Sequence, residues 1–307
     1  MKEPLVSVVM PSFNDRCEFL KESIESILNQ TYKNLELIIA DDSTLEESKY
    51  IIDSYANKDS RIIINRREGR RGISAAVNDA IKMAKGDYIA HMDADDVSLP
   101  NRLELQMKLF KSKEVSVVGG HTVSIDEYGN EKPQALKLPC NDTLIKKGFK
   151  DGLACVLNPT SLVRKEVFNK VGGYEELWKC AEDYDMWYRI AALRYEFANV
   201  PEVVLKYRSS HGENDHIKRA DILPKFCCMS RLKYSLGISR RLSEKEFLNI
   251  EELVESHPLC RLSIVATKKG SVLYNLIKKM NLRKIVIRIT NAYFARHRNY
   301  YLTMIER

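Results

Sequence analysis

The sequence predicts an α/β fold in which a mostly parallel sheet is covered by helices on both faces. Short runs of β-branched and other apolar residues alternate with amphipathic segments through the first third of the chain, and this alternation is typical of strand–helix–strand units. The strand runs are apolar at almost every position, as expected where both faces of a parallel sheet are buried. Carboxylates directly follow two of these runs, at the sheet edge where ligands bind in open α/β folds.

The elements of this α/β part are expected in chain order. Apolar runs predict strands at residues 5–10, 35–40, 61–64 and 87–92. Apolar residues at helical spacing predict helices at residues 19–28, 46–55, 73–84 and 99–110. We expect Asn14 or Asp15 to cap the first of these helices and Gly86 to cap the carboxyl end of the third.

The segments after residue 115 are shorter and less regular. A strand is expected at 115–118, and Asp126–Asn130 is expected to form a turn between antiparallel strands. The remaining expected elements are a strand at 158–164, a short helix at 167–174, a helix at 182–193 and a strand at 203–207. Beyond His216 the chain is expected to be helical and increasingly basic.

Composition and charge limit the possible classes of function. The longest apolar runs are far shorter than the ~20 residues of a membrane-spanning helix, and no signal peptide is expected. The seven cysteines are scattered without metal-binding spacing, which is typical of reduced thiols in a cytoplasmic protein. Residues 260–307 carry a net charge of +10 and residues 1–259 carry −3, so the overall +7 comes from the tail. We therefore expect no nucleic-acid partner for the protein as a whole.

Three acidic groups are candidates for chemistry. They are Asp41-Asp42 after the second expected strand, Asp93-Ala94-Asp95-Asp96 after the fourth, and Glu182-Asp183 at the start of a later helix. Hard oxygen ligands crowded at a strand end suit Mg²⁺ or Mn²⁺ shared with a phosphate. The alternative is a solvated acidic turn that caps the helix after it.

Five segments in order resemble a known family. They are VSVVMPSFN, ELIIADDST, GDYIAHMDADDVSLPNRLELQ, NPTSLVRKEVF and VGGYEELWKCAEDYDMWYRI. Over residues 5–207 their order and spacing resemble the family 2 glycosyltransferases. The resemblance implies the GT-A fold, an inverting mechanism and a nucleotide-sugar donor. It also implies a catalytic domain at 1–215, with a nucleotide-sugar-binding half at 1–115 and an acceptor half at 116–215, followed by a helical basic extension at 216–307.

The resemblance further assigns roles to single residues. It implies donor-binding roles outside the acidic cluster for Pro11, Phe13, Asn14, Asp42, Arg71 and Asn78. The first three would line the base pocket, Asp42 would accept a hydrogen bond from the base, and Arg71 and Asn78 could reach the diphosphate or the sugar.

Within the acidic groups, the resemblance implies that Asp95 contacts the ribose or the metal ion, that Asp96 binds the metal and that Asp93 supports them. The tandem carboxylates leave this division open. Asp183 would be the general base that takes the proton of the acceptor hydroxyl.

The acidic groups and the resemblance together predict a metal-dependent glycosyltransferase that uses Mn²⁺ or Mg²⁺ and a UDP-sugar. The resemblance alone implies that its acceptor is a glycan or a lipid-linked acceptor in cell-surface or exopolysaccharide biosynthesis. Processive relatives carry a QxxRW motif and membrane-spanning helices nearby, and neither is found here, so transfer of one sugar per encounter is expected. The alternative is a nucleotide-sugar-binding scaffold protein of the same fold without turnover.

The basic tail at 260–307 has two interpretations. Its apolar residues at helical spacing include Val272, Leu273, Leu276, Ile277 and Met280. A basic amphipathic helix suits the anionic inner face of a cell membrane, which predicts a peripheral membrane association. In the other interpretation the apolar face packs on the catalytic domain and the charges are solvated.

Overall fold

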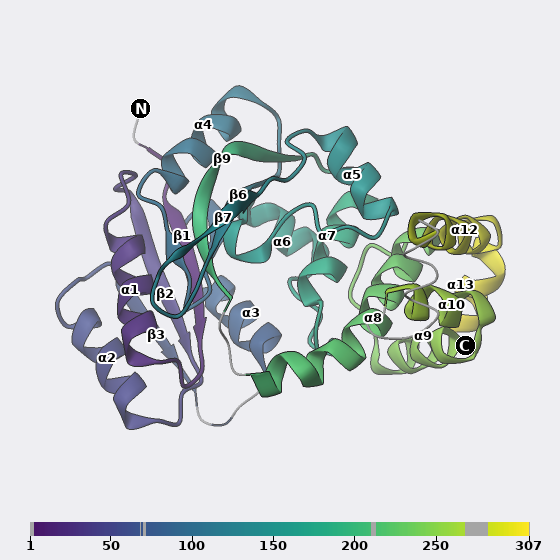
Figure 1. Ribbon diagram of the computed structural model, residues 1–307, viewed down its shortest axis with the longest axis horizontal. Helices are drawn as coiled ribbons and strands as arrows, with labels where there is room; N and C mark the ends of the chain where they lie inside the picture. Colours follow the sequence, from purple (N-terminus) through teal and green to yellow (C-terminus); the bar gives the residue numbers. More distant parts are fainter. Residues whose placement is uncertain (1–2, 68, 70–71, 210–212, 268–281, 307) are drawn as a thin grey trace. The chain divides into compact units, whose positions relative to one another are not determined.

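The chain forms a mixed α/β structure with further helices toward its end (Figure 1). This computed structural model describes residues 3–67, 69, 72–209, 213–267 and 282–306. The strands are β1 (Val6–Ser12), β2 (Leu35–Asp41), β3 (Ile62–Arg66), β4 (Tyr88–His91), β5 (Val97–Ser98), β6 (Val117–Ile125), β7 (Glu131–Leu136), β8 (Leu162–Arg164) and β9 (Phe197–Arg208). The helices before residue 200 are α1 (Cys17–Leu28), α2 (Glu46–Ala56), α3 (Ile73–Met83), α4 (Arg102–Ser112), α5 (Asp142–Lys150), the 3₁₀ turn η1 (Asn158–Thr160), α6 (Lys165–Val171) and α7 (Glu182–Ala192). The later helices are α8 (Glu213–Leu236), α9 (Glu244–Ser256), α10 (Pro258–Thr267), α12 (Arg283–Arg296) and α13 (Arg298–Glu306).

All described strands belong to one sheet. Its order is β3-β2-β1-β4-β8-β6-β9-β5, with β7 paired to β6. Strands β1 to β4 pair in parallel, as do β6 and β9, whereas β5, β7 and β8 pair antiparallel with their neighbours. The predicted α/β class with a mostly parallel sheet is therefore confirmed, as is the hairpin turn at Asp126–Asn130 between antiparallel β6 and β7.

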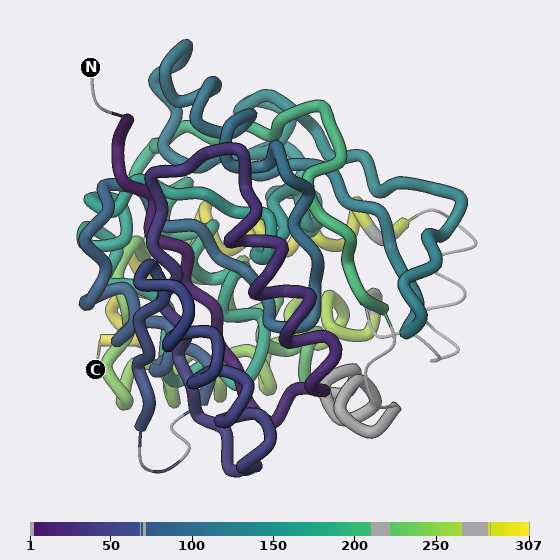
Figure 2. The backbone as a smooth tube through the Cα atoms, turned by 90° about the vertical axis from the view of Figure 1, so that its left-hand side faces the viewer, coloured from purple at the N-terminus to yellow at the C-terminus, as the bar shows by residue number. Residues whose placement is uncertain are grey.

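Helices cover both faces of this sheet. From β1 the chain moves outward through α1, β2, α2 and β3, and it then returns through α3 to β4 on the other side of β1. Because right-handed crossovers in opposite directions lie on opposite faces, α1 and α2 share one face and α3 lies on the other, as Figure 1 shows. Figure 2 is viewed from the side that carries α1 and α2. The strands between these layers bury Val8, Leu37 and Ile39 completely, as their apolar runs predicted.

Two expected helix caps are wrong. Helix α1 begins at Cys17 with Arg16 at its N-cap and no side-chain cap, because Asn14 and Asp15 bond to other groups described below. Helix α3 ends at Met83, and Gly86 has no positive φ. A Cβ on Gly86 would lie 2.6 Å from the carbonyl oxygen of Leu5, so close packing on β1 requires this glycine.

Several strand boundaries differ from expectation. The strand expected at 203–207 is the last part of a longer strand, β9, that begins at Phe197. The segment expected as a strand at 158–164 divides into η1 and β8. The short β5 lies directly after the acidic loop and was not expected, because two residues carry no readable periodicity.

The chain divides into two compact units. The first consists of Met1–Ile145, Val156–Lys170 and Tyr195–Ser210 and contains the sheet. The second consists of Lys146–Cys155, Val171–Arg194 and His211–Arg307, and its core includes Trp178, Phe226, Leu232, Ile250 and Phe294.

The helical character expected beyond His216 is confirmed for the described part of the tail. The apolar residues noted at 272–280 lie outside the described residues. Among the helices that are described, none is long and apolar enough to span a membrane. The expected domain boundary near residue 215 stays a prediction.

Candidate functional site

The carboxyl ends of β1, β2 and β4 meet at one edge of the sheet. In the parallel registers Ser12 of β1 lies beside Asp41 of β2, and Val9 lies beside His91 of β4. The backbone N–H of Asp42 donates to the carbonyl oxygen of Ser12 at 3.0 Å. The loops that follow these strands are therefore neighbours at the edge where ligands bind in open α/β folds.

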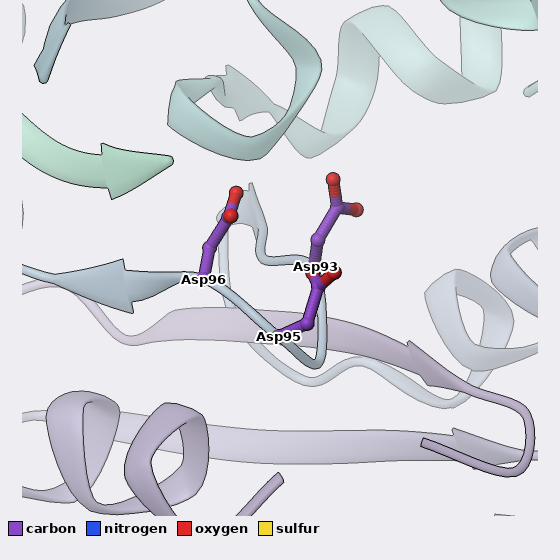
Figure 3. A group of neighbouring side chains, drawn as sticks. All are labelled: Asp93, Asp95 and Asp96. Carbon is purple, nitrogen blue, oxygen red and sulfur yellow. The ribbon is translucent and has the colours of Figure 1, made fainter. Parts of the chain in front are cut away.

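Three carboxylates form a cluster in the loop after β4. One carboxyl oxygen from each of Asp93, Asp95 and Asp96 lies within 4.8 Å of the other two. In Figure 3 the side chains of Asp93 and Asp96 point to the same side of this loop. Asp96 is only 1% exposed, whereas Asp93 and Asp95 are half-buried. The acidic residues after this strand thus bring three carboxylates into one compact group.

The surroundings of Asp96 fit a divalent cation. Its Oδ1 accepts a hydrogen bond from the backbone N–H of Arg208 at 2.8 Å, whereas its Oδ2 is buried without a hydrogen-bond partner in the described structure. Burial, followed by the charges of Asp93 and Asp95, raises the pKa of Asp96 well above its usual range. A bound cation would satisfy Oδ2 and reverse this effect, and carboxylate oxygens are ligands that Mg²⁺ and Mn²⁺ prefer.

Buried side chains stabilise the carboxylate loop through hydrogen bonds. Ser23 of α1 donates to the carbonyl oxygen of Asp93 at 2.9 Å, and His91 Nε2 lies 3.0 Å from Asp93 Oδ1. Arg102 of α4 is completely buried and donates to the carbonyl oxygens of His91 at 2.8 Å and Ser161 at 3.3 Å. Burial lowers the pKa of Arg102 to about 10, so its positive charge persists at neutral pH near the carboxylates.

The loop after β1 carries the residues expected to line a base pocket. Phe13 is 37% exposed, and Pro11 and Asn14 are half-buried. Asn14 has a positive φ of 56°, and its Oδ1 accepts hydrogen bonds from the backbone N–H groups of Thr44 at 2.8 Å and Leu45 at 3.0 Å. Asn14 therefore joins the loop after β1 to the loop after β2.

Asp15 adds a fourth carboxyl group that was expected only as a cap. Its Oδ2 accepts hydrogen bonds from Ser12 Oγ at 2.7 Å and from the backbone N–H of Phe13 at 3.0 Å. Burial raises the pKa of Asp15, and the charges of Asp95 and Asp93 raise it further. The loops after β1 and β4 are thus electrostatically coupled.

The two carboxylates at the carboxyl end of β2 have different surroundings. Asp41 is completely buried and accepts a hydrogen bond from Arg66 Nε at 2.7 Å. Asp42, the residue expected to bind the base, is half-buried at the same end of the strand. The expectation that the acidic groups after β2 and β4 share one sheet edge agrees with the strand order and registers.

Of the two residues expected to reach a diphosphate or sugar, Asn78 belongs to the described part of the chain and Arg71 does not. Asn78 lies in α3 and is 6% exposed. Arg71 lies outside the described residues.

Asp183, the expected general base, belongs to the second compact unit. It is the second residue of α7, and the N-cap residue Ala181 has a left-handed conformation with a φ of 58°. Asp183 is half-buried, and its Oδ1 accepts a hydrogen bond from the backbone N–H of Tyr184 at 2.8 Å.

A buried ionic network anchors α7 within the second unit. Asp185 is completely buried and accepts hydrogen bonds from Arg189 Nε at 2.7 Å and Lys233 Nζ at 2.6 Å. Burial raises the pKa of Asp185, but the charges of Lys233 and Arg189 outweigh it and hold that pKa below its usual value. Arg189 also donates to the carbonyl oxygens of Val171 and Gly173. These contacts hold α7, the helix that carries Asp183, in place within the second unit.

Comparison with known proteins gives a consistent result. Residues 7–172 match the sequence model of Glycosyl transferase family 2. An uncharacterized glycosyltransferase of Methanocaldococcus jannaschii is 38% identical over 220 residues, which are 70% of this chain and 74% of that protein.

Two solved structures share the fold. The crystal structure of S. aureus TarS with UDP-GlcNAc superposes with a TM-score of 0.62 at 18% identity, covering 98% of this chain and 90% of that chain. The mannosyltransferase PcManGT of Pyrobaculum calidifontis, with GDP-Man and Mn²⁺, superposes with a TM-score of 0.59 at 15% identity, covering 96% of this chain and 87% of that chain.

Proposed function

The chain belongs to glycosyl transferase family 2 and is a glycosyltransferase, and we propose that it is a metal-dependent, inverting enzyme that transfers single sugars. The proposed donor is a UDP-sugar, and the proposed acceptor is a hydroxyl of a glycan or lipid-linked acceptor in cell-surface or exopolysaccharide biosynthesis. The observation that carries the metal dependence is the buried Oδ2 of Asp96, which has no hydrogen-bond partner among the described residues and lies within a cluster of three carboxylates.

The donor would bind across the loops after β1, β2 and β4. Pro11, Phe13 and Asn14 line the proposed base pocket, and exposed Phe13 offers an aromatic face to a base. Asp42 accepts the proposed hydrogen bond from a base N–H.

The diphosphate end of the donor would face the carboxylate cluster. Asp96 and Asp95 hold the proposed divalent cation, with Asp93 beside them, and Asn78 and Arg71 contact the diphosphate or the sugar. Mn²⁺ or Mg²⁺ bound there supplies positive charge for the departing nucleoside diphosphate.

Asp183 acts as the general base in this proposal. It accepts the proton of the acceptor hydroxyl while that oxygen forms a bond to the anomeric carbon. The bond from the anomeric carbon to the diphosphate oxygen breaks at the same time, and its electron pair leaves with the nucleotide. Because attack and departure occur on opposite faces of the sugar, the configuration at the anomeric carbon inverts.

Calorimetric titration of the full chain with UDP, GDP and dTDP, each with and without Mn²⁺, tests the donor site. The neighbours that bind UDP-GlcNAc and GDP-Man make both bases necessary in this comparison. We expect one nucleotide, UDP, to bind in a Mn²⁺-dependent way, and we expect Asp95→Ala and Asp96→Asn to weaken that binding at least about tenfold.

Asp87→Asn is a matched control for these variants. Asp87 is exposed and lies just before the first residue of β4, at the opposite end of the strand from the carboxylate cluster. Equal losses in Asp87→Asn, or Mn²⁺-independent binding in the unaltered chain, would contradict the metal site. Preference for GDP or dTDP would replace the proposed UDP-sugar by another donor.

Turnover is tested separately from binding. Asp183→Asn is expected to retain nucleotide binding and to lose about 10²- to 10⁴-fold in donor turnover, the usual contribution of a general base. Glu252→Gln, an exposed carboxylate of α9, is the control. Donor binding without any turnover in the unaltered chain would favour the scaffold alternative.

The tail and the location of the protein are further parts of the proposal. We propose that residues 1–215 are the catalytic domain and residues 216–307 a helical basic extension. The extension would dock on the anionic inner face of the cell membrane, with the enzyme in the cytoplasm. Support comes from α12, where Ile285 and Ile289 are 50% and 55% exposed next to exposed Lys284 and Arg288.

A further inference from the structure

Arg208 connects the end of β9 to the carboxylate loop. It is the last residue of β9 and is 1% exposed, although it lies more than a hundred residues after the loop in the sequence. Its backbone N–H donates to Asp96 Oδ1 at 2.8 Å, and its Nε donates to the carbonyl oxygen of Asp95, also at 2.8 Å. One residue thus holds both the backbone and a side chain of the loop.

The rest of the guanidinium is held by other parts of the first unit. Nη1 donates to the carbonyl oxygen of Asp126 at 3.1 Å, and Nη2 forms an ion pair with Glu22 of α1. The guanidinium carbon lies 4.1 Å above the ring centroid of Phe19. Because Glu22 takes the ion pair, the charge of Arg208 is balanced outside the carboxylate cluster.

These contacts determine which oxygen of Asp96 can meet a ligand. The amide of Arg208 occupies Oδ1 and leaves Oδ2 buried without a hydrogen-bond partner in the described structure. Nε, by holding the carbonyl oxygen of Asp95, fixes the peptide plane between Asp95 and Asp96 and with it the direction of both side chains. Such fixed orientation is what a partner behind the metal ligands provides.

We propose that Arg208 is a positioning residue that holds Asp95 and Asp96 in the arrangement that binds a divalent cation. The proposal rests on the metal dependence proposed above. Arg208 touches neither cation nor substrate in this role and acts through the two carboxylates.

The sign of a change in metal affinity distinguishes positioning from simple electrostatics. Removing a cation near three carboxylates strengthens their attraction for Mn²⁺ if charge alone matters. Loss of positioning weakens it. Arg208→Met removes charge and donors, whereas Arg208→Lys keeps the charge and loses the planar fork that reaches several acceptors at once.

The experiment measures the affinity of the full chain for Mn²⁺ alone, by calorimetry and by electron paramagnetic resonance of free Mn²⁺. We expect the dissociation constant to rise about tenfold or more in Arg208→Met and by a smaller factor in Arg208→Lys. The control is Arg16→Met, because Arg16 also stacks on Phe19, at 4.5 Å, and pairs with an exposed glutamate, Glu127. We expect its affinity for Mn²⁺ to be unchanged.

An unchanged or tighter affinity for Mn²⁺ in both Arg208 variants overturns the positioning role, and so does an equal loss in Arg16→Met. If Arg208→Met does not fold, Arg208→Lys carries the same decision. Failure of the unaltered chain to bind Mn²⁺ overturns the proposed metal dependence and the positioning role with it. Mn²⁺ binding that is equal in the unaltered chain and the variants overturns the positioning role alone.

Discussion

Arg102 shows how a single buried charge supports the carboxylate loop. Its guanidinium is completely buried, and its donors reach the carbonyl oxygens of His91 and Ser161 and the side chain of Gln106. A buried arginine is tolerated because its donors meet buried acceptors. Of these, the carbonyl oxygen of Ser161 also accepts from the backbone N–H of His91 at 3.0 Å. The residue therefore stabilises the end of β4 and balances part of the negative charge above it.

We expect Arg102→Met to lower the free energy of unfolding by about 3 kcal/mol, because the buried carbonyl oxygen of His91 and the buried Oε1 of Gln106 lose the donors that Arg102 supplies. Urea unfolding of the full chain measures this change. Lys108→Met on the same helix is the control, since Lys108 forms an exposed ion pair with Glu104, and we expect a change below about 0.5 kcal/mol. Similar losses in the two variants would contradict the role of Arg102.

The sequence could reveal the acidic residues of the site but not their supports. Asp93, Asp95 and Asp96 are neighbours in the chain, and an apolar run that ends in carboxylates indicates a strand end facing a ligand. Arg102 and Arg208 are arginines like many others until the fold buries them, and Arg208 meets the loop only because β9 joins the sheet. The sequence likewise indicates only a helix cap for Asp15, and its proximity to the carboxylate loop follows from the fold.

At the scale of elements, a capping box in the sequence stabilises the start of α9. Ser243 caps the helix, its Oγ accepting from the backbone N–H of Glu246, while Glu246 Oε2 accepts from the backbone N–H of Ser243 at 2.8 Å. Arg240 adds two further hydrogen bonds to the Glu246 carboxylate. The hydrogen bonds from Arg240, and then those from Ser243, lower the pKa of Glu246 to about 2.

This lowered pKa predicts a pH dependence of stability. The contribution of Glu246 to stability is fully present above the usual pKa of 4.5 and is lost as the pH falls toward about 2. In that range the carboxylate of Glu246 is protonated in the unfolded chain but still ionised in the folded chain, so falling pH favours the unfolded chain. We expect Glu246→Gln to lower the free energy of unfolding by about 1 to 2 kcal/mol at pH 7. Chemical unfolding between pH 2 and 7 should show the two chains converging at the acid end.

Glu244→Gln, an exposed change in the first turn of the same helix, is the control for this titration. We expect it to remain within about 0.5 kcal/mol of the unaltered chain at neutral pH. A difference between Glu246→Gln and the unaltered chain that stays constant down to pH 2 would contradict the assignment.

The boundaries of elements were less predictable than their order. The apolar runs gave the strands β1 to β4 because buried parallel strands need apolar residues throughout. The start of β9 at Phe197 depends instead on its pairing with β6, which no local pattern encodes. Gly86 resembles a helix cap in the sequence, whereas the closeness of Leu5 across the sheet explains it.

At the scale of the whole molecule, the net positive charge belongs to the last part of the sequence. The net charge of +7 arises in the last 48 residues of the sequence, which carry +10. In α12, Ile285 and Ile289 are one turn apart and exposed, with Lys284 beside them. Arg288 is paired with Asp151 at 2.5 Å in the second unit, so the charge of Lys284 is the stronger candidate for contact with an anionic surface.

We predict that this exposed part of α12 binds anionic membranes. In sedimentation with vesicles at low salt, the full chain should bind phosphatidylglycerol-containing vesicles and not purely phosphatidylcholine ones, because each cation near the surface contributes about 1 kcal/mol. The double variant Ile285→Ser/Ile289→Ser should bind about tenfold more weakly, since it loses apolar area for the interface. Lys284→Glu should weaken binding to a similar extent and reduce its dependence on salt.

Leu248→Ser is the matched control, because Leu248 is 55% exposed on α9 of the same unit. Equal binding by all of these chains would assign the exposed isoleucines of α12 no membrane role and would favour solvation of the basic charges.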